Sequence, residues 1–191
     1  MGTLVFLDVE TTGLGEERRL TEIACVSLSK TRWEILMKQK LVSQRTLPDN
    51  VFALHFLINP DQPVSPSEVR LNGITDAMLA EEPSFTKESV DGLMDFLLRR
   101  PSQPNARCKT AWMKEMRNVY VLDSLYCFKD IEKEWSMNTP KLCEEILGAK
   151  GQEHRALTDA VRLFNVSLAY GPAFLHHLTE ATRFNQYFEP P

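Results

Sequence analysis

Two acidic residues near the N-terminus have a spacing that suits a metal site. Asp8 and Glu10 stand two positions apart, and Asp8 belongs to the apolar run LVFLDV at residues 4–9. Such a continuous run of strand-forming residues is typical of a buried strand. Because every second side chain of a strand points to the same face, both carboxylates can reach one cation. The other interpretation of a bare D-x-E pattern is a frayed strand end with two solvated acids.

Hydroxyl groups and a glycine follow these acids directly. Residues 11–14 read TTGL, which predicts a turn with two hydroxyls beside the carboxylates. Backbone N–H groups in such a turn can hold an oxygen of a phosphate or a sugar. The turn therefore favours a ligand-binding role for Asp8 and Glu10.

A second candidate motif, HRALTDA, lies at residues 154–160. Five positions on a helix correspond to a rotation of about 500°, so His154 and Asp159 cannot point the same way from one regular helix. We expect His154 in the loop or the first turn, and Asp159 one turn further in, beside an apolar stripe that includes Ala160 and Leu163. The alternative is a surface histidine followed by a charge at a helix start.

The elements that must position these residues alternate between strand and helix patterns. The 191 residues, 43% of them hydrophobic, suffice for one core, so we expect a single α/β domain over residues 1–191. The run at 4–9 should form a central strand that is buried on both faces. Further strands are expected at 21–29, 33–42, 53–59 and the beginning of 119–125. Helix patterns occur at 75–80, 86–99, 139–147, 155–170 and 174–183.

Composition and the N-terminal segment exclude several classes of protein. The four cysteines form no C-x-x-C pair and no Cys/His cluster with zinc spacing, so we expect reduced thiols and no zinc site. No basic region precedes the first apolar run, and no run approaches the roughly 18 residues that span a bilayer. We therefore expect an intracellular protein, nuclear or cytoplasmic, that does not associate with a membrane. The net charge of -4 does not decide for or against nucleic acid, because an acidic metal site would mask a basic substrate path.

Three segments together resemble the DEDDh, or DnaQ-like, 3′-to-5′ exonucleases. FLDVETTGL at 6–14 and HRALTDA at 154–160 occur in the family's order, and SEVRLNGITDAML at 67–79 looks like the family's loop around Gly-Ile-Thr. The element VLDSL at 121–125 and the final FEPP make the chain most similar to the three-prime repair exonucleases. The resemblance implies a ribonuclease H-like fold, with a mixed central sheet flanked by helices.

The resemblance also implies a reaction. Asp8, Glu10 and Asp159 would hold two Mg²⁺ ions, with Mn²⁺ as an alternative. His154 would be the general base that takes a proton from the attacking water. The products would be nucleoside monophosphates released from DNA 3′ ends.

The implied substrate is the 3′ end of single-stranded DNA. RNA is an alternative, because the metal site does not read the 2′-hydroxyl. The residues implied for binding the terminal nucleotide are Thr11, Thr12, Leu14, Gly73, Ile74 and Thr75. Ile74 would stack beneath this nucleotide. The resemblance further implies a homodimer that forms through a sheet edge.

One acid of the family's motif is missing. Family members carry a strand, a His-Asn-Gly turn and an Asp between the helix that ends here near Arg100 and the VLDSL element. This chain has instead the basic stretch RRPSQPNARCKTAWMKEMRN at 99–118, in which Glu115 is the only acid before Asp123. The missing piece normally includes a sheet strand next to the first one, so the sheet can lack a central strand as well.

Three explanations of this gap stay open. The chain can be a shortened form that keeps the fold and has lost most of its activity. The segment VYVLD can instead occupy the vacant strand position and bring Asp123 or Asp130 near the metals. In the third case Glu115 substitutes, or the protein binds nucleic acid without cleaving it. The basic residues available for such binding are Arg99, Arg100, Arg107, Lys109, Lys114 and Arg117. A solvated loop is the alternative interpretation of these residues.

Overall fold

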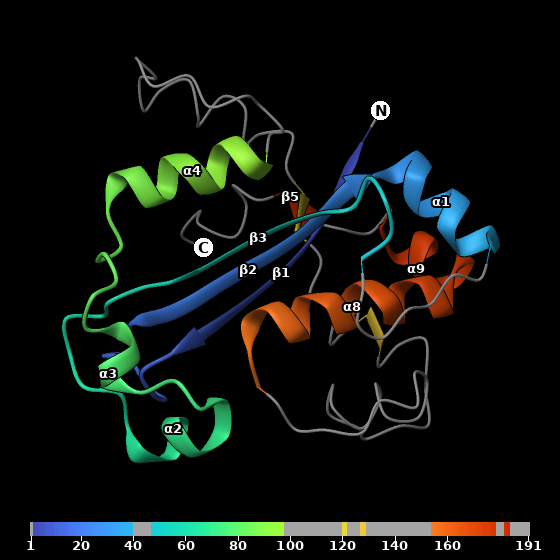
Figure 1. Cartoon of the computed structure of the whole chain (residues 1–191). Helices are drawn as coiled ribbons and strands as arrows, with labels where there is room; N and C mark the ends of the chain where they lie inside the picture. Colours follow the sequence, from blue (N-terminus) through green and yellow to red (C-terminus); the bar gives the residue numbers. More distant parts are fainter. Residues whose placement is uncertain are drawn as a thin grey trace.

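A computed structural model of the chain describes residues 2–39, 47–97, 120–121, 127–128, 154–178 and 182–183 (Figure 1). The expected helix at 139–147, the basic stretch at 99–118 and the acids Glu115, Asp123 and Asp130 lie outside these residues. Both acids of the first motif and the whole HRALTDA motif lie within them.

Three antiparallel strands form the main sheet. They are β1 (Thr3–Thr11), β2 (Leu20–Ser29) and β3 (Phe52–Leu57), in the order β1-β2-β3. The middle strand β2 is almost fully buried, because helices lie over both faces of the sheet (Figure 1). The strands expected at 21–29 and 53–59 are thereby confirmed.

The first strand, β1, is an edge strand of the described sheet, which corrects the expectation of a central strand buried on both faces. Among the described residues, β1 pairs only with β2. One of its faces packs against α8 (Ala156–Tyr170), but Leu7 and Val9 on the other face are 45% and 39% exposed. The helix on that side, α4 (Lys87–Leu97), packs on a cluster centred on β2 and the end of β3, so it leaves this part of β1 uncovered.

The main hydrophobic core lies between the sheet and α8. The apolar stripe expected at 155–170 is observed, since Ala156, Ala160 and Phe164 recur every four residues and are buried. Phe164 packs edge-on against Phe6 of β1, with ring centroids 5.6 Å apart. This contact holds α8 over the strand that carries the first acidic motif.

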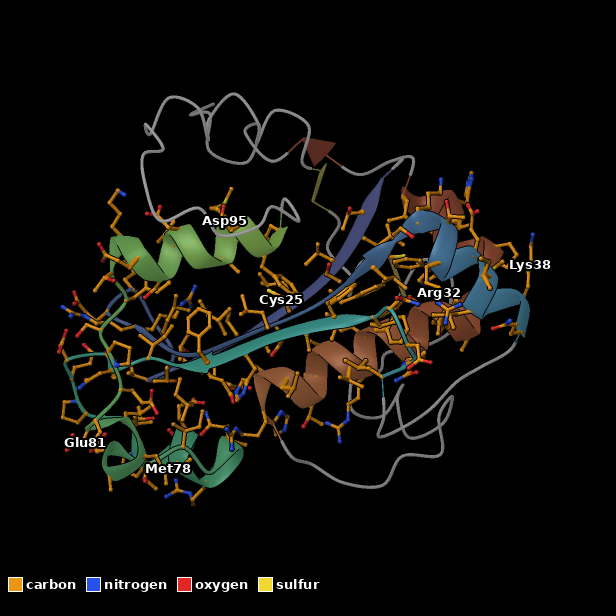
Figure 2. The ribbon with its side chains drawn as sticks, turned by 45° about the horizontal axis from the view of Figure 1, so that its top comes forward. Cys25, Arg32, Lys38, Met78, Glu81 and Asp95 are labelled. Atoms are coloured by element: carbon orange, nitrogen blue, oxygen red, sulfur yellow. The ribbon has the colours of Figure 1, made fainter. Side chains whose placement is uncertain are left out.

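A second, smaller core covers the opposite face of the sheet, beneath α4 (Figure 2). Cys25 is fully buried in this core, and Leu93 and Phe96 of α4 pack around it. In Figure 2, Asp95 lies on the side of α4 that faces away from the sheet. Burial raises the pKa of the Cys25 thiol to about 12, so this thiol stays protonated and unreactive at neutral pH.

A helix, α1 (Lys30–Gln39), occupies most of the segment expected to be a strand at 33–42. The hydroxyl of Ser29 accepts a hydrogen bond from the backbone N–H three residues further on at 3.1 Å, as an N-cap does. Trp33 and Leu36, which stand three positions apart, are both buried. The strand prediction was wrong because this apolar spacing serves a helix, and the cap at Ser29 starts that helix.

The segment after β3 contains one helix more than the sequence predicted. The additional helix is α2 (Pro66–Asn72), which begins with a proline and is capped by Ser65. It is followed by α3 (Asp76–Leu79), which confirms the helix pattern at 75–80. The pair Ser65-Pro66 was the available signal for α2, but the other prolines around it favoured the interpretation of this segment as turns.

The C-terminal elements differ in part from the expected pattern. The helix expected at 174–183 is α9 (Pro172–His177), and β5 (Thr182–Arg183) follows it. β5 pairs antiparallel with β4 (Tyr120–Val121), which agrees with the strand expected at the beginning of 119–125. The helix is shorter than predicted because the pairing with β4 requires extended backbone at 182–183.

The architecture is α/β, as expected, with helices on both faces of a sheet. Parallel pairing between the described residues is limited to one isolated bridge, between Asn59 and Ser84. The named strands of the described residues all pair antiparallel. None of the described helices is both long and apolar enough to cross a bilayer.

Candidate metal centre

The two acids of the first motif lie on the α8 side of β1. Asp8 and Glu10 share the strand face that carries Phe6, as the two-residue period of a strand requires. Because Phe6 packs against α8, the same face directs both carboxylates toward the start of this helix. The prediction that the two acids project together is confirmed.

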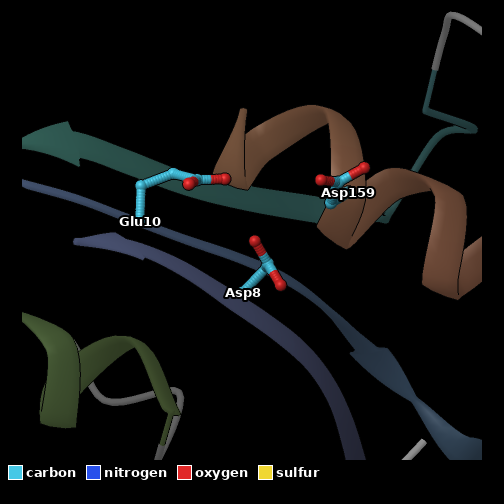
Figure 3. Close-up of side chains that lie close together, drawn as sticks. All are labelled: Asp8, Glu10 and Asp159. Atoms are coloured by element: carbon cyan, nitrogen blue, oxygen red, sulfur yellow. The ribbon is translucent and has the colours of Figure 1, made fainter. Parts of the chain in front are cut away.

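Asp159 completes a cluster of three carboxylates. It lies in the first turn of α8, and one oxygen from each of Asp8, Glu10 and Asp159 lies within 4.8 Å of the other two (Figure 3). Within the described part of the chain, no other group of three or more His, Cys, Asp or Glu side chains is this close. The packing of α8 on β1 thus joins two motifs from opposite ends of the sequence.

Burial and mutual repulsion make this cluster unfavourable without a cation. Burial, together with neighbouring negative charges of which Asp159 is the strongest, raises the pKa of Asp8 to about 7. Burial also raises the pKa of Glu10 to about 7, although a hydrogen bond from Asn72 opposes the rise. A divalent cation between these side chains would relieve the repulsion and favour their ionised forms.

The donor set suits a hard cation. All three side chains offer carboxylate oxygens, the ligands that Mg²⁺ and Mn²⁺ prefer. Arg162 Nη1 donates a hydrogen bond to Asp159 Oδ1 at 2.8 Å, which balances part of the charge of Asp159. Asp8 and Glu10 have no such cationic neighbour among the described residues, so their charge is left for a metal ion.

Asn72 connects Glu10 with the Gly-Ile-Thr segment. Its Nδ2 donates to Glu10 Oε2 at 3.2 Å, and its Oδ1 accepts from the N–H of Ile74 at 2.9 Å. Asn72 is the last residue of α2 and is buried. The sequence analysis missed this residue, although an amide directly before Gly-Ile-Thr was available as a signal.

The Gly-Ile-Thr residues form the link between α2 and α3. Gly73 ends α2 with φ 71°, a left-handed conformation that glycine adopts without steric cost. The hydroxyl of Thr75 caps α3 by accepting the N–H of Met78 at 3.3 Å. Ile74 is fully buried in a small cluster beneath the two helices. Its side chain therefore has no open face for the expected stacking on a nucleotide, because the packing of α2 and α3 encloses it.

Of the three contacts predicted at the end of β1 and in the turn after it, Thr11 and Thr12 are held by hydrogen bonds and Leu14 is exposed. Thr12 is buried, and its Oγ1 accepts hydrogen bonds from Arg19 N–H at 3.1 Å and from Gln62 Nε2 at 2.6 Å. The hydroxyl of Thr11 donates to a carbonyl of the same turn at 3.0 Å. Leu14 is 94% exposed, so its side chain is open to a ligand.

His154 lies in the segment directly before α8, as expected, and is half-buried. It is not a member of the carboxylate cluster. A general base must reach the attacking water rather than the metal, so membership of the cluster is not required of it. That role stays a prediction.

Glu22 of β2 is a charged residue near the cluster that the sequence analysis did not single out. It faces Glu10 in the β1–β2 register and is fully buried. Its carboxylate accepts hydrogen bonds from Arg155 at 2.7 to 3.1 Å and from the N–H of Ala156 at 2.8 Å, and His55 Nε2 lies 2.6 Å from it. Burial alone would raise the pKa of Glu22, but these partners lower it. The available signal was the one charged residue in a strand whose other members are apolar residues, threonine and serine.

A family match covers most of the chain. The model of the family RNase_T, described as exonuclease, matches residues 5–166. This range extends from β1 into α8 and includes all three members of the carboxylate cluster.

Two curated relatives are DNA polymerase III subunits epsilon. The protein of Haemophilus influenzae (strain ATCC 51907 / DSM 11121 / KW20 / Rd) is 31% identical over 93 residues, which are 49% of this chain and 32% of that protein. The protein of Pasteurella multocida (strain Pm70) is 34% identical over 83 residues, which are 44% of this chain and 29% of that protein. The chain thus matches about a third of the length of these relatives.

Solved structures of nucleases share the fold at low sequence identity. Cell-death related nuclease 4 (CRN-4) has a TM-score of 0.58 at 12% identity, covering 88% of this chain and 63% of its own. A full-length 3′-exonuclease has a TM-score of 0.58 at 13% identity, covering 93% and 60%. A 3′-exonuclease that recognises the histone mRNA stem-loop has a TM-score of 0.57 at 12% identity, covering 95% and 83%.

The family match, the relatives and the fold agree with one another. The ribonuclease H-like α/β fold that the resemblance implied is confirmed. The assignment to the three-prime repair branch stays a prediction. With the family match over residues 5–166 and the carboxylate cluster in place, the chain belongs to the RNase_T family of exonucleases, within the DEDDh superfamily.

Proposed function

We propose that this chain is a metal-dependent 3′-to-5′ exonuclease that releases nucleoside monophosphates from DNA 3′ ends. The observation that carries the proposal is the carboxylate cluster, in which oxygens of Asp8, Glu10 and Asp159 lie within 4.8 Å of one another. The family match supports the reaction class, and the name of the curated relatives, a DNA polymerase subunit, favours DNA as the substrate.

The reaction would divide between a metal site and a base. Asp8, Glu10 and Asp159 would hold two Mg²⁺ or Mn²⁺ ions, which when bound stabilise charge on the attacking and leaving oxygens of an in-line displacement. His154 would take the proton of the water as the water oxygen bonds to phosphorus and the bond from phosphorus to the 3′ oxygen breaks. The half-buried position of His154 directly before α8 supports this role, because Asp159 lies in the first turn of the same helix.

The number of acids limits the expected activity. The described residues place three carboxylates in the cluster, whereas the family resemblance implies a fourth ligand. Ligand charge sets the affinity of a site for a divalent cation, so the site should bind its metals more weakly unless Glu115, Asp123 or Asp130, which lie outside the described residues, supplies the fourth acid. The missing acid favours a second candidate function, a nucleic-acid-binding module that cleaves slowly or not at all.

A labelled strand tests the proposal. A single-stranded DNA with a 3′-terminal label, incubated with the chain and Mg²⁺ or Mn²⁺, should release the labelled mononucleotide, and Asp8→Ala should abolish the release. Glu81→Ala is the matched control, because Glu81 is an exposed acid outside the cluster (Figure 2). Equal release by the Asp8→Ala and unsubstituted chains would mean that the activity does not come from this site.

Two further measurements separate the candidates. A chain that binds the strand with a salt-dependent affinity but releases nothing is a binding module. RNA of the same sequence belongs in the same experiment, because one solved neighbour recognises an mRNA stem-loop. Faster release from RNA than from DNA would make the chain an RNA-trimming exonuclease.

The homodimer that the resemblance implies is part of the proposal. Light scattering of the purified chain should give twice the mass of 21.9 kDa. The mass of one chain over a wide concentration range would remove this part of the proposal and leave the reaction unaffected.

A further inference from the structure

Glu22 is a buried side chain near the candidate site whose carboxylate has several hydrogen-bond partners. Its carboxylate is fully buried in β2, and it accepts hydrogen bonds from Arg155 Nε and Nη2 and from the N–H of Ala156. His55 of β3 lies on the same carboxylate, with Nε2 2.6 Å from Oε1. A buried carboxylate is costly unless hydrogen bonds and positive charge compensate it. Because the partners of Glu22 include residues at the start of α8, this side chain joins the helix to the sheet.

The bonds from Glu22 replace a helix cap that α8 lacks. Arg155 occupies the N-cap position with extended backbone, but its side chain makes no capping hydrogen bond. The first helical residue, Ala156, donates its N–H to Glu22 Oε2 at 2.8 Å instead. An acceptor with a negative charge at this end of a helix satisfies an unpaired N–H and interacts favourably with the helix dipole. Glu22 thus caps α8 from a neighbouring strand.

This cap reaches the candidate site through one further hydrogen bond. Arg155 O accepts the N–H of Asp159 at 2.9 Å in the first turn of α8. His154 is bonded covalently to Arg155 on the other side. Arg155, which Glu22 holds, is therefore linked to the proposed metal ligand Asp159 by a hydrogen bond and to the proposed base His154 by a peptide bond.

The cap also lies next to the other two acids. Glu22 is the cross-strand partner of Glu10, and Asp8 is opposite Ala24 in the same register. The carboxylate of Glu22 therefore contacts the start of α8, while its strand pairs with the segment of β1 that carries the two acids. The oxygens of Glu22 are already occupied by Arg155 and Ala156, so Glu22 is unsuited to serve as the missing fourth ligand.

We propose that Glu22 is a positioning residue, whose buried carboxylate caps α8 and holds Asp159 at the distance from Asp8 and Glu10 that metal binding requires, with His154 directly before the helix. The proposal rests on the proposed function for its catalytic meaning. Loss of the clamp, which is the contact of Glu22 with Arg155 and Ala156, should weaken metal binding while the fold persists.

The test measures Mn²⁺ binding to the full chain by titration calorimetry. Glu22→Gln and Arg155→Gln should each lower the Mn²⁺ affinity by about 10- to 100-fold, the usual effect of losing a residue that orients metal ligands. The double variant should lose no more than the worse single variant, because both changes break one clamp. His55→Gln is the matched control, since it removes a partner of Glu22 but leaves the bonds to α8, and it should change the affinity far less.

Hydrogen exchange provides a readout that needs neither metal nor cleavage. In Glu22→Gln the amides of the first turn of α8, Asp159 included, should exchange at least tenfold faster, while those of α4 on the other face of the sheet keep their rate. If Glu22→Gln does not fold, Arg155→Gln carries both measurements, because Arg155 is at the surface end of the clamp with a side chain 31% exposed.

Three outcomes would overturn the proposal. Unchanged Mn²⁺ affinity in both single variants would show that the clamp does not position the ligands. Unchanged exchange in the first turn of α8 would show that Glu22 does not hold the helix. A tighter Mn²⁺ affinity in Arg155→Gln would indicate that Glu22, once released, is itself a ligand. Failure of the proposed function looks different, because the unsubstituted chain would then bind Mn²⁺ or protect α8 without releasing nucleotides.

Discussion

Glu10 and Glu22 face each other across β1 and β2, but their surroundings are opposite. Glu10 has the neutral amide of Asn72 as its hydrogen-bond donor, and burial raises its pKa to about 7. Glu22 is held by Arg155, by His55 and by a backbone N–H, and its pKa is lowered. One carboxylate is thus left for a cation, and the other is used to hold the fold.

The first prediction concerns pH in the absence of metal. Between about pH 4 and about 7, the folded chain keeps protons on Asp8 and Glu10 that the unfolded chain has lost, because both pKa values are raised. The free energy of unfolding should therefore fall as the pH rises through this window, and these groups add no further change above it. Urea unfolding in EDTA at several pH values measures the slope.

The control for this slope is the double variant Asp8→Asn, Glu10→Gln. Its free energy of unfolding should fall less steeply with rising pH over the same window, because the amide side chains at positions 8 and 10 do not titrate. Glu22 has a lowered pKa, so its contribution is lost only at acid pH, as the pH falls below its ordinary value and through its folded one. An identical slope in the double variant would contradict the assignment of the window to these two acids.

The second prediction concerns stabilisation by metal. At pH 7.5, Mn²⁺ at 100 times its dissociation constant should raise the free energy of unfolding by about 2.7 kcal/mol, and EDTA should reverse the gain. Asp159→Asn should remove most of it, since this variant lacks one member of the cluster. Thermal unfolding with and without Mn²⁺ measures both effects, with Glu81→Gln as the exposed-acid control. A full metal response in Asp159→Asn would place the cation elsewhere.

The third prediction concerns Asn72. Asn72→Ala removes the donor to Glu10 and leaves the N–H of Ile74 buried without its acceptor, which should cost about 1 to 3 kcal/mol of stability. The matched control is Asn59→Ala, because Asn59 Oδ1 also accepts the N–H two residues further on, at 2.9 Å, but at an exposed site. Urea unfolding of both variants should show a clearly larger loss for Asn72. Equal losses would mean that burial of this contact contributes little.

The fourth prediction separates Leu14 from Ile74. Leu14 is 94% exposed, so Leu14→Ala should leave stability within about 0.5 kcal/mol and should raise the KM for a DNA strand if the side chain contacts the terminal nucleotide. Ile74 is fully buried, so Ile74→Ala should cost about 2 to 5 kcal/mol. Paired unfolding and single-strand cleavage assays distinguish the two. A large loss of stability in Leu14→Ala, with unchanged KM, would argue against a contact with substrate.

Local pattern accounts for the elements that were predicted correctly. The two-residue spacing of Asp8 and Glu10 placed both on one strand face, and the four-residue recurrence of apolar residues in α8 placed Asp159 beside its buried stripe. These features depend on backbone periodicity, which a sequence shows directly. Where the spacing fitted two structures, as with Trp33 and Leu36, the choice between strand and helix was wrong.

The sequence by itself determined the chemistry available to this protein: which acids share a face, which helix carries the third, and which family the motifs resemble. The tertiary structure decided which of these groups meet. Only the packing of α8 on β1 brings Asp159 to Asp8 and Glu10, and only the fold joins Glu22 to Arg155 across 133 positions of sequence. The reason is physical, since periodicity acts over a few residues, whereas burial and buried charge are settled by whichever distant segments pack together.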